Sequence, residues 1–393
     1  MRILTRYVLI DLLKVFSMTL TGLTLLIFVA LIGKEAVDKG ISFGPLMRMA
    51  PYLLPQAMQL TVPGTMLLAV TFVYGRMSSY NEIVAIKALG ISPMHVIWPT
   101  FVLATLVSFG AVVLNDVAVS WGRLGVQRVF LSSIEEVTYG QLRVKHAYNL
   151  GKANITVRDV VGHRLIQPTL IIQSTGDEPA LTVSAEEAEL SLLPEEGKIV
   201  LRLDNFEIEG KFKYEDPGTF NYEVSLEELT GSTTKNRSPS TYALAEIAPA
   251  IKEQEETLAR IEQSLVAQSA FGMMTGDYDS LSDTAWKVHE REKQNAEFRL
   301  HRLHTEPWRR WANGFSCLCF VLIGVPVSVW MKQSDFLASF FICFLPILLV
   351  YYPLFIVSVT QAKDGTFPPE SVWIGNFLLS LVGIWMLRRV NRY

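Results

Sequence analysis

The chain of 393 residues is 50% hydrophobic and 19% charged, with a net charge close to −3, and this near-neutral balance argues against nucleic-acid binding. The apolar residues are concentrated in six stretches that lack Asp, Glu, Lys and Arg. At about 1.5 Å rise per residue, most of them can cross a hydrocarbon core about 30 Å thick. We therefore predict an α-helical integral membrane protein. The stretches are Val15–Gly33, Met49–Gly75, Ala88–Asn115, Trp311–Met331, Phe336–Ala362 and Ser371–Leu387.

The first stretch, Val15–Gly33, is expected to be a membrane span and not a cleavable signal peptide. It is long, has no small-residue cleavage site, and is followed by further spans. All three cysteines, Cys317, Cys319 and Cys343, fall inside predicted spans, so we expect no disulfide framework in the soluble part.

Lys and Arg in the tails and short loops predict the orientation of the chain. Basic residues occur in both tails, at Arg2, Arg6, Lys14, Arg388, Arg389 and Arg392. An even number of spans places both tails on one side, together with the Arg76–Lys87 loop. We expect that side to be cytoplasmic and the segment Asp116–Arg310 to be extracytoplasmic.

The loop sequence YGRMSSYNEIVAIKALGISP, between the second and third stretches, predicts a short helix over residues 79–89. Ser79 and Glu82 have capping-box spacing, and Gly90 stands where a C-terminal cap is expected. Glu82 and Lys87 lie near the helix ends that favour their charges. A self-contained apolar helix is unusual in a loop that otherwise only connects two spans.

The first part of the large insert, Val137–Glu228, has the pattern of short β-strands separated by turns. One hairpin is expected to turn at Pro194–Gly197, with Ile199, Leu201 and Leu203 on one face of its second strand. Several such strands predict an antiparallel sandwich or a jelly roll.

The second part of the insert, Ser240–His304, predicts two helices separated by a break at Gly272–Ser282. Leu258, Ile261 and Leu265 form a narrow apolar stripe, as expected for a helical hairpin.

Motifs for catalysis are absent from the sequence. It contains no P-loop, no G-x-S-x-G, no H-E-x-x-H and no C-x-x-C, so neither an enzyme nor a catalytic residue is predicted. His301 and His304 have helical spacing, but Arg299 and Arg302 beside them favour a solvated face over a metal site.

Two basic clusters border the predicted extracytoplasmic side. Lys34 and Lys39 follow the first span, and Arg309 and Arg310 precede the fourth. Lysines at span ends often place their charge among lipid headgroups without a further role. The alternative is attraction of an anionic amphiphile.

The chain resembles the YjgP/YjgQ-like permease subunits of the lipopolysaccharide-transport ABC exporter of Gram-negative inner membranes. The resemblance is carried by RYVLIDLLKVF, IGKEAVDKG, the NEIVAIKALGIS loop, WRRWANGFSCLCFVLIGVPVSVW, DGTFPP and the terminal MLRRVNR. It implies six transmembrane helices, three before and three after an inserted jelly-roll-like β domain.

The resemblance also implies functional residues. In the family, a coupling helix sits in a groove of a separate cytoplasmic ATPase. We assign Glu82, Ile83, Ile86 and Lys87 to this contact. ATP and Mg would be held by the ATPase, and we expect no cofactor in the chain itself. Basic residues at the outer end of the first span face lipid A phosphates in the family. Lys34 matches such a position, which favours substrate binding over a role as a headgroup anchor, and we add Lys39, Arg309 and Arg310 as candidates.

The expected organisation is a transmembrane half (1–115), a periplasmic jelly-roll-like domain (116–239), a periplasmic helical segment (240–306) and a second transmembrane half (307–393). Two permeases would enclose a cavity from which an ATPase dimer drives lipopolysaccharide, or another anionic glycolipid, toward a periplasmic jelly-roll bridge. The second permease could be a paralogue or another copy of this chain, and the resemblance does not distinguish the two paralogous permeases.

Two alternatives remain open from the sequence. One is a mechanotransmitting ABC subunit, although four spans are more usual there. The other is a membrane receptor with an extracytoplasmic sensor domain. The segment 240–304 is longer than the family's usual link into the fourth span.

Overall fold

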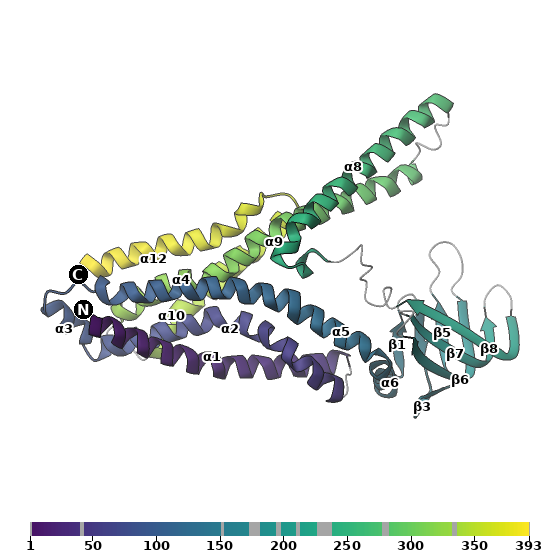
Figure 1. The fold of residues 1–393 in the computed structure, drawn as a ribbon, viewed down its shortest axis with the longest axis horizontal. Helices are drawn as coiled ribbons and strands as arrows, with labels where there is room; N and C mark the ends of the chain where they lie inside the picture. Colours follow the sequence, from purple (N-terminus) through teal and green to yellow (C-terminus); the bar gives the residue numbers. More distant parts are fainter. Residues whose placement is uncertain are drawn as a thin grey trace. The chain divides into compact units, whose positions relative to one another are not determined.

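The structure is a computed structural model that describes residues 2–39, 43–150, 153–172, 181–193, 198–209, 213–225, 238–276, 283–331 and 336–392. The described chain is mostly helical, with an antiparallel sheet inserted in its middle (Figure 1). It divides into two compact units. The helical unit comprises Met1–Ile27, Pro55–Ser120 and Pro239–Tyr393, and the sheet unit comprises Phe28–Leu54 and Trp121–Ser238.

The N-terminal part of the chain contains the first three helices that are long and apolar enough to cross a membrane. Its first elements are α1 (Arg2–Lys39), α2 (Phe43–Ser79), the short α3 (Glu82–Ala88) and α4 (Met94–Val117). Then α4 continues through a π-helical turn, η1 (Ala118–Arg123), into α5 (Leu124–Ser132), which α6 (Ile134–Lys145) follows.

The C-terminal part contains three more helical stretches of this kind, so the described residues hold six candidate membrane spans, as many as were predicted. Its elements are η3 (Pro239–Thr241), α8 (Leu244–Thr275), α9 (Asp283–Trp330), α10 (Phe336–Pro346), η5 (Ile347–Tyr351), α11 (Tyr352–Lys363), η6 (Pro369–Trp373) and α12 (Ile374–Arg392). The predicted boundary between the helical segment and the second transmembrane half lies between residues 306 and 307. In the structure α9 runs through Pro307 without interruption, so the second arm of the hairpin and the fourth span are one helix.

The helical unit is built around α2 and α9. The most apolar windows of these two helices are 67% and 78% buried, against 6% for α1 and 17% for the segment Leu337–Lys363. Val70, Tyr74, Ala104 and Val325 are all buried in one cluster that joins α2, α4 and α9. The exposed apolar surfaces of the outer helices are what a lipid-facing helix presents.

Close packing of α4 against α9 depends on Gly314. A methyl group at this position would lie 2.3 Å from a Val112 side-chain carbon and 3.1 Å from the Ser108 carbonyl oxygen. We expect Gly314→Ala to destabilise the protein by about 1–3 kcal/mol through overpacking. Gly110→Ala is the control, because nothing lies within 4 Å of a methyl group there. Equal unfolding temperatures for the two variants would contradict close helix packing at Gly314.

The sheet unit contains eight described strands, all paired antiparallel. They are β1 (Ala147–Leu150), β2 (Ala153–Thr156), β3 (Asp159–Val161), β4 (Arg164–Ile166), β5 (Thr169–Ile172), β6 (Leu181–Leu193), β7 (Lys198–Glu209) and β8 (Lys213–Ser225). The order is β1-β2-β5-β6-β4-β3, and β7 pairs with both β6 and β8. This establishes the expected antiparallel sheet, whereas the jelly roll stays a prediction.

The predicted hairpin is confirmed as β6 and β7, although the turn Pro194–Gly197 lies outside the described residues. Leu201 and Leu203 are 1% and 0% exposed and belong to the core of the sheet. The side chain of Ile199 is outside the described part. Tyr139 of α6 joins this core: its hydroxyl donates to the His163 carbonyl (2.6 Å) and accepts from the Leu190 amide (2.9 Å).

The helical hairpin predicted over Ser240–His304 is confirmed as α8 and the first half of α9. The apolar stripe Leu258, Ile261 and Leu265 is half-buried, and Lys293 of α9 forms an ion pair with Glu262 of α8 at 2.8 Å. The break begins later than predicted, because α8 continues through Gly272 and ends at Gly276, whose φ of 71° makes it a left-handed cap.

Candidate functional site

The short helix α3 connects α2 to α4 at the end of the helical unit where both termini lie (Figure 1). It has seven residues, fewer than the 79–89 predicted. Its end matches the prediction: Gly90 has a φ of 74°, its amide donates to the Lys87 carbonyl, and the Ile91 amide donates to the Ile86 carbonyl. This pair of hydrogen bonds is a Schellman motif, which fixes where the chain leaves the helix.

The predicted capping box at the start of α3 is wrong. Ser79 is the last residue of α2, and its hydroxyl donates to the Gly75 carbonyl at 3.0 Å. The residue that begins α3 is Asn81, which has a left-handed φ of 57° and makes no side-chain cap. Glu82 therefore does not form a capping box with Ser79. It lies half-buried in the first turn of α3, where the helix dipole favours a carboxylate.

One face of α3 is anchored in its own unit. Ile83 and Ile86 are 7% and 8% exposed and pack in the cluster that contains Val96 of α4. Both were predicted to contact an ATPase, but the structure places them against the chain's own helices. Lys87, a third predicted contact, directs its ammonium group to the Val390 carbonyl at 3.4 Å and so faces the last turn of α12.

Three apolar side chains at α3 are exposed and were not predicted as contacts: Tyr80 precedes the helix, Val84 lies within it and Leu89 is its C-cap. Tyr80, Val84 and Leu89 are 73%, 42% and 76% exposed. Helical periodicity could have predicted the exposure of Val84, because this residue points away from the face that Ile83 and Ile86 share. Together with Glu82 these side chains form a candidate docking surface, defined here as Tyr80, Glu82, Val84 and Leu89.

Polar contacts join the last turns of α2, which precede α3, to three other helices. The Tyr74 hydroxyl of α2 pairs with that of Thr100 of α4 at 2.7 Å, and Ser78 donates to the Val329 carbonyl of α9 at 3.1 Å. Arg76 forms an ion pair with Asp11, which joins α2 to α1. The C-terminal part of α2 is therefore joined to α1, α4 and α9.

At the other end of the helical unit, charged residues form a buried cluster. Arg310 is 0% exposed; its guanidinium donates to Asp116 at 2.7 Å and to the Tyr242 carbonyl at 2.6 Å. Asp116 also accepts from the Leu244 amide at 2.8 Å. The end of α4, the start of α8 and the middle of α9 are thus joined at one point. Arg310, predicted to bind substrate, is enclosed by protein.

Glu306 forms the second part of this cluster. It is 1% exposed and is paired with Arg309 at 2.6 Å and with Lys363 at 3.2 Å. The described cluster contains three cations and two carboxylates, so one positive charge is in excess. Arg309 and Lys363 are 19% and 28% exposed, so the excess positive charge of the cluster is partly accessible at the surface. Lys363 was not predicted as a site residue, because only the fold brings it to α9.

Lys34 belongs to the sheet unit and is exposed near the end of α1. No hydrogen bond or ion pair holds it within the described residues, so its ammonium group is available to an anion. The side chain of Lys39 is outside the described part. The predicted site residues therefore fall into three groups: the base and edge of α3, the buried cluster of α9, and Lys34.

Among the described residues, no group of three or more His, Cys, Asp and Glu side chains could hold a metal ion. The sequence matches the family model described as lipopolysaccharide export system permease LptF/LptG over residues 6–389, which is nearly the whole chain. No curated protein matches the chain.

Proposed function

The chain belongs to the LptF/LptG family of lipopolysaccharide export permeases, and from this premise we propose that it is the permease subunit of an ATP-driven ABC exporter. Family membership makes it a multi-pass inner-membrane transport component and not a catalytic enzyme. The observation that supports the ABC mechanism is the exposed apolar face of the anchored helix α3. A short helix with such a face is suited to a groove in a partner.

In this proposal the docking surface of α3 enters a groove of a cytoplasmic ATPase dimer, which holds ATP and Mg. Ile83 and Ile86 fix α3 to the bundle, while Tyr80, Val84 and Leu89 contact the partner. Glu82 pairs with a basic residue of the ATPase. Closure of the ATPase then moves α3, and the contacts at Tyr74, Ser78 and Arg76 pass this movement to the spans.

The proposed path of the lipid lies on the periplasmic side of the membrane. We place the sheet unit in the periplasm, both termini in the cytoplasm, and a second permease, a paralogue or another copy, across the cavity. Lipopolysaccharide or a related glycolipid leaves the outer leaflet through this cavity and passes by the β domain to a jelly-roll bridge. Lys34, Lys39 and Arg309 are the candidates for its phosphates, and Lys363 joins them because it shares the excess charge with Arg309.

Substitution of Lys34 tests the phosphate contact. A basic side chain near an anionic headgroup contributes about 1 kcal/mol, so Lys34→Ala is expected to weaken glycolipid capture about fivefold and Lys34→Glu more. High salt should reduce the difference between the two variants, because exposed charges are screened. The measurement is photo-crosslinking of the glycolipid that co-purifies with the protein. Equal crosslinking in wild type and both variants would exclude this site.

The proposed function as a whole is tested by purifying the protein from its native membrane and identifying bound lipids and partners by mass spectrometry. We expect an ABC ATPase and a phosphorylated glycolipid. An ATPase without glycolipid would favour a mechanotransmitting subunit. A signalling enzyme in place of an ATPase would favour a membrane receptor.

A further inference from the structure

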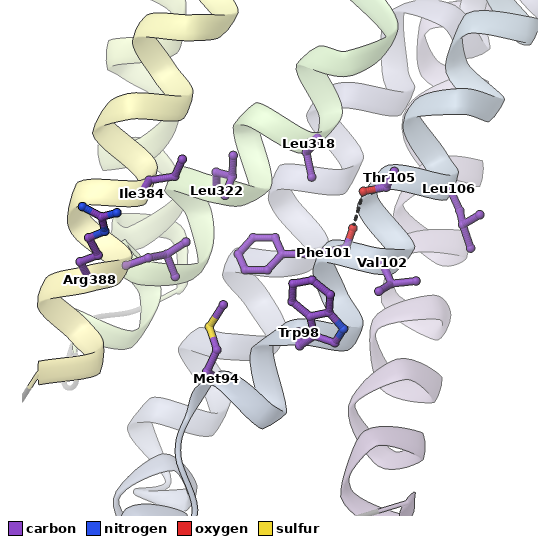
Figure 2. Close-up of a pocket in the computed structure, with 11 residues that line it drawn as sticks. Met94, Trp98, Phe101, Val102, Thr105, Leu106, Leu318, Leu322, Ile384 and Arg388 are labelled. Carbon is purple, nitrogen blue, oxygen red and sulfur yellow. Dashed lines mark hydrogen bonds between the residues drawn. The ribbon is translucent and has the colours of Figure 1, made fainter.

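A lateral groove of about 660 Å³ lies between α4, α9 and α12, at the end of the helical unit where both termini lie. Its volume is within the range of about 300–1,000 Å³ that is usual for small-molecule sites. Trp98, Phe101 and Val102 line it from α4, Leu318 and Leu322 from α9, and Ile384 from α12 (Figure 2). These six side chains, out of eleven that line the groove, are all large and hydrophobic.

The lining offers almost nothing to hydrogen-bond with. Thr105 contributes the only hydroxyl in the lining, and it already donates to the Phe101 carbonyl at 2.8 Å (Figure 2). Trp98 and Val102 are 61% and 45% exposed, so the groove is open at the surface of the helical unit. An occupant must therefore be apolar along most of its length.

One end of the groove carries a cation. Arg388 of α12 lines it and is exposed, and within the described ranges no carboxylate pairs with it (Figure 2). Its neighbour Arg389 lies instead over the ring of Trp385, 5.9 Å from the centroid. Arg388 is thus an uncompensated positive charge at the end of a hydrophobic groove.

We propose that this groove binds an anionic phospholipid, with an acyl chain along α4, α9 and α12 and the phosphate at Arg388. A single charge at one end of an apolar surface is complementary to an amphiphile, and basic pockets between transmembrane helices bind anionic headgroups. A helix of another protein is less suitable, because it would have to place a carboxylate opposite Arg388 and remain apolar elsewhere. The site is separate from the proposed substrate residues and does not depend on the transport role.

Quenching of Trp98 fluorescence by brominated lipids can report whether the groove is occupied. The protein is reconstituted in vesicles of phosphatidylcholine and phosphatidylglycerol at one fixed ratio, with brominated acyl chains carried by either lipid. Bromine quenches tryptophan at short range, and the contribution of Trp98 is the difference between each protein and its Trp98→Phe version. Because the surface charge is the same in both vesicle types, any preference for brominated phosphatidylglycerol reports selection by the groove.

We expect Trp98 to be quenched more by brominated phosphatidylglycerol than by brominated phosphatidylcholine. Arg388→Gln should lower this preference about fivefold, as expected from the loss of one basic side chain near an anionic headgroup. Arg388→Lys should retain most of it. Arg389→Gln is the matched control and should leave the preference unchanged, because Arg389 does not line the groove.

Three results would overturn the proposal. Equal quenching by the two lipids would show that Trp98 meets bulk lipid only. Equal effects of Arg388→Gln and Arg389→Gln would assign the preference to the general charge of the helix end. Absence of quenching by either lipid would show that a protein surface covers the groove. A variant that has unfolded would be identified by reaction of its buried Cys317, Cys319 and Cys343 with a maleimide dye. If Arg388→Gln unfolds, the Arg388→Lys variant replaces it, and loss of the lipid preference in folded Arg388→Lys would contradict the proposal.

Discussion

Replacement of Arg310 by methionine is expected to destabilise the protein by about 3 kcal/mol, because it leaves the Asp116 carboxylate and the Tyr242 carbonyl without the guanidinium to which both are bonded. Arg310 is fully buried between Asp116 and Glu306, and it also holds the Tyr242 carbonyl at the start of the helical hairpin. Unfolding can be followed with a maleimide dye that reacts with the buried cysteines Cys317, Cys319 and Cys343 as they become accessible.

The matched control is Arg309→Met on the same helix. Arg309 is 19% exposed, and Glu306 keeps Lys363 as a partner when it is removed, so we expect a much smaller effect. Asp116→Asn provides a second test, because the amide retains an acceptor for Leu244 but loses the charge that faces Arg310. If Arg310→Met unfolded at the wild-type temperature, the cluster would not be the structural junction described here.

Reversal of charge at Glu82 is expected to abolish transport while leaving the protein folded. The absence of a capping box removes one structural explanation for this carboxylate, because Ser79 is bonded to Gly75 and not to the start of α3, and leaves the helix dipole as the other. Glu82→Gln should reduce transport, and Glu82→Lys should reduce it further because like charges would then face each other at the ATPase. The measurement is lipid release per ATP hydrolysed, with the amount of bound ATPase determined in parallel.

A compensating change on the ATPase sharpens this test. Replacing the basic ATPase residue that pairs with Glu82 by an acidic residue should restore part of the transport lost in the Glu82→Lys variant. The control within the chain is Val84→Ala, which trims the apolar face without altering charge and should weaken ATPase binding more than the coupling of hydrolysis to release. Normal transport by Glu82→Lys with the ATPase still bound would remove Glu82 from the mechanism.

The existence and order of the main elements could be predicted from the sequence, because long uncharged stretches and alternating strands are local patterns. The hairpin of β6 and β7 and the Gly90 cap are examples. The start of α3 was not predictable in this way. A serine and a glutamate with capping-box spacing are also compatible with a serine that ends the previous helix, and only the path of α2 decides between these arrangements.

The polar contacts of the site could be predicted only in part. Arg309 and Arg310 are adjacent and look equivalent in the sequence, but Arg309 pairs with Glu306 of α9, whereas Arg310 pairs with Asp116 of α4. The partner Asp116 lies 194 positions from Arg310 along the chain, and Lys363 reaches Glu306 from the end of α11. Neither spacing nor composition indicates which of two neighbouring arginines is buried, because that depends on how the fourth span packs against α4.

The central proposal is that this chain moves glycolipid at the expense of ATP hydrolysed by a partner. The most direct measurement is release of lipopolysaccharide from proteoliposomes that contain the permease pair and the ATPase, into a soluble jelly-roll acceptor. We expect release that requires ATP hydrolysis and is lost in Glu82→Lys. ATP hydrolysis at the wild-type rate, with no more lipopolysaccharide in the acceptor than from vesicles lacking this chain, would contradict the proposal.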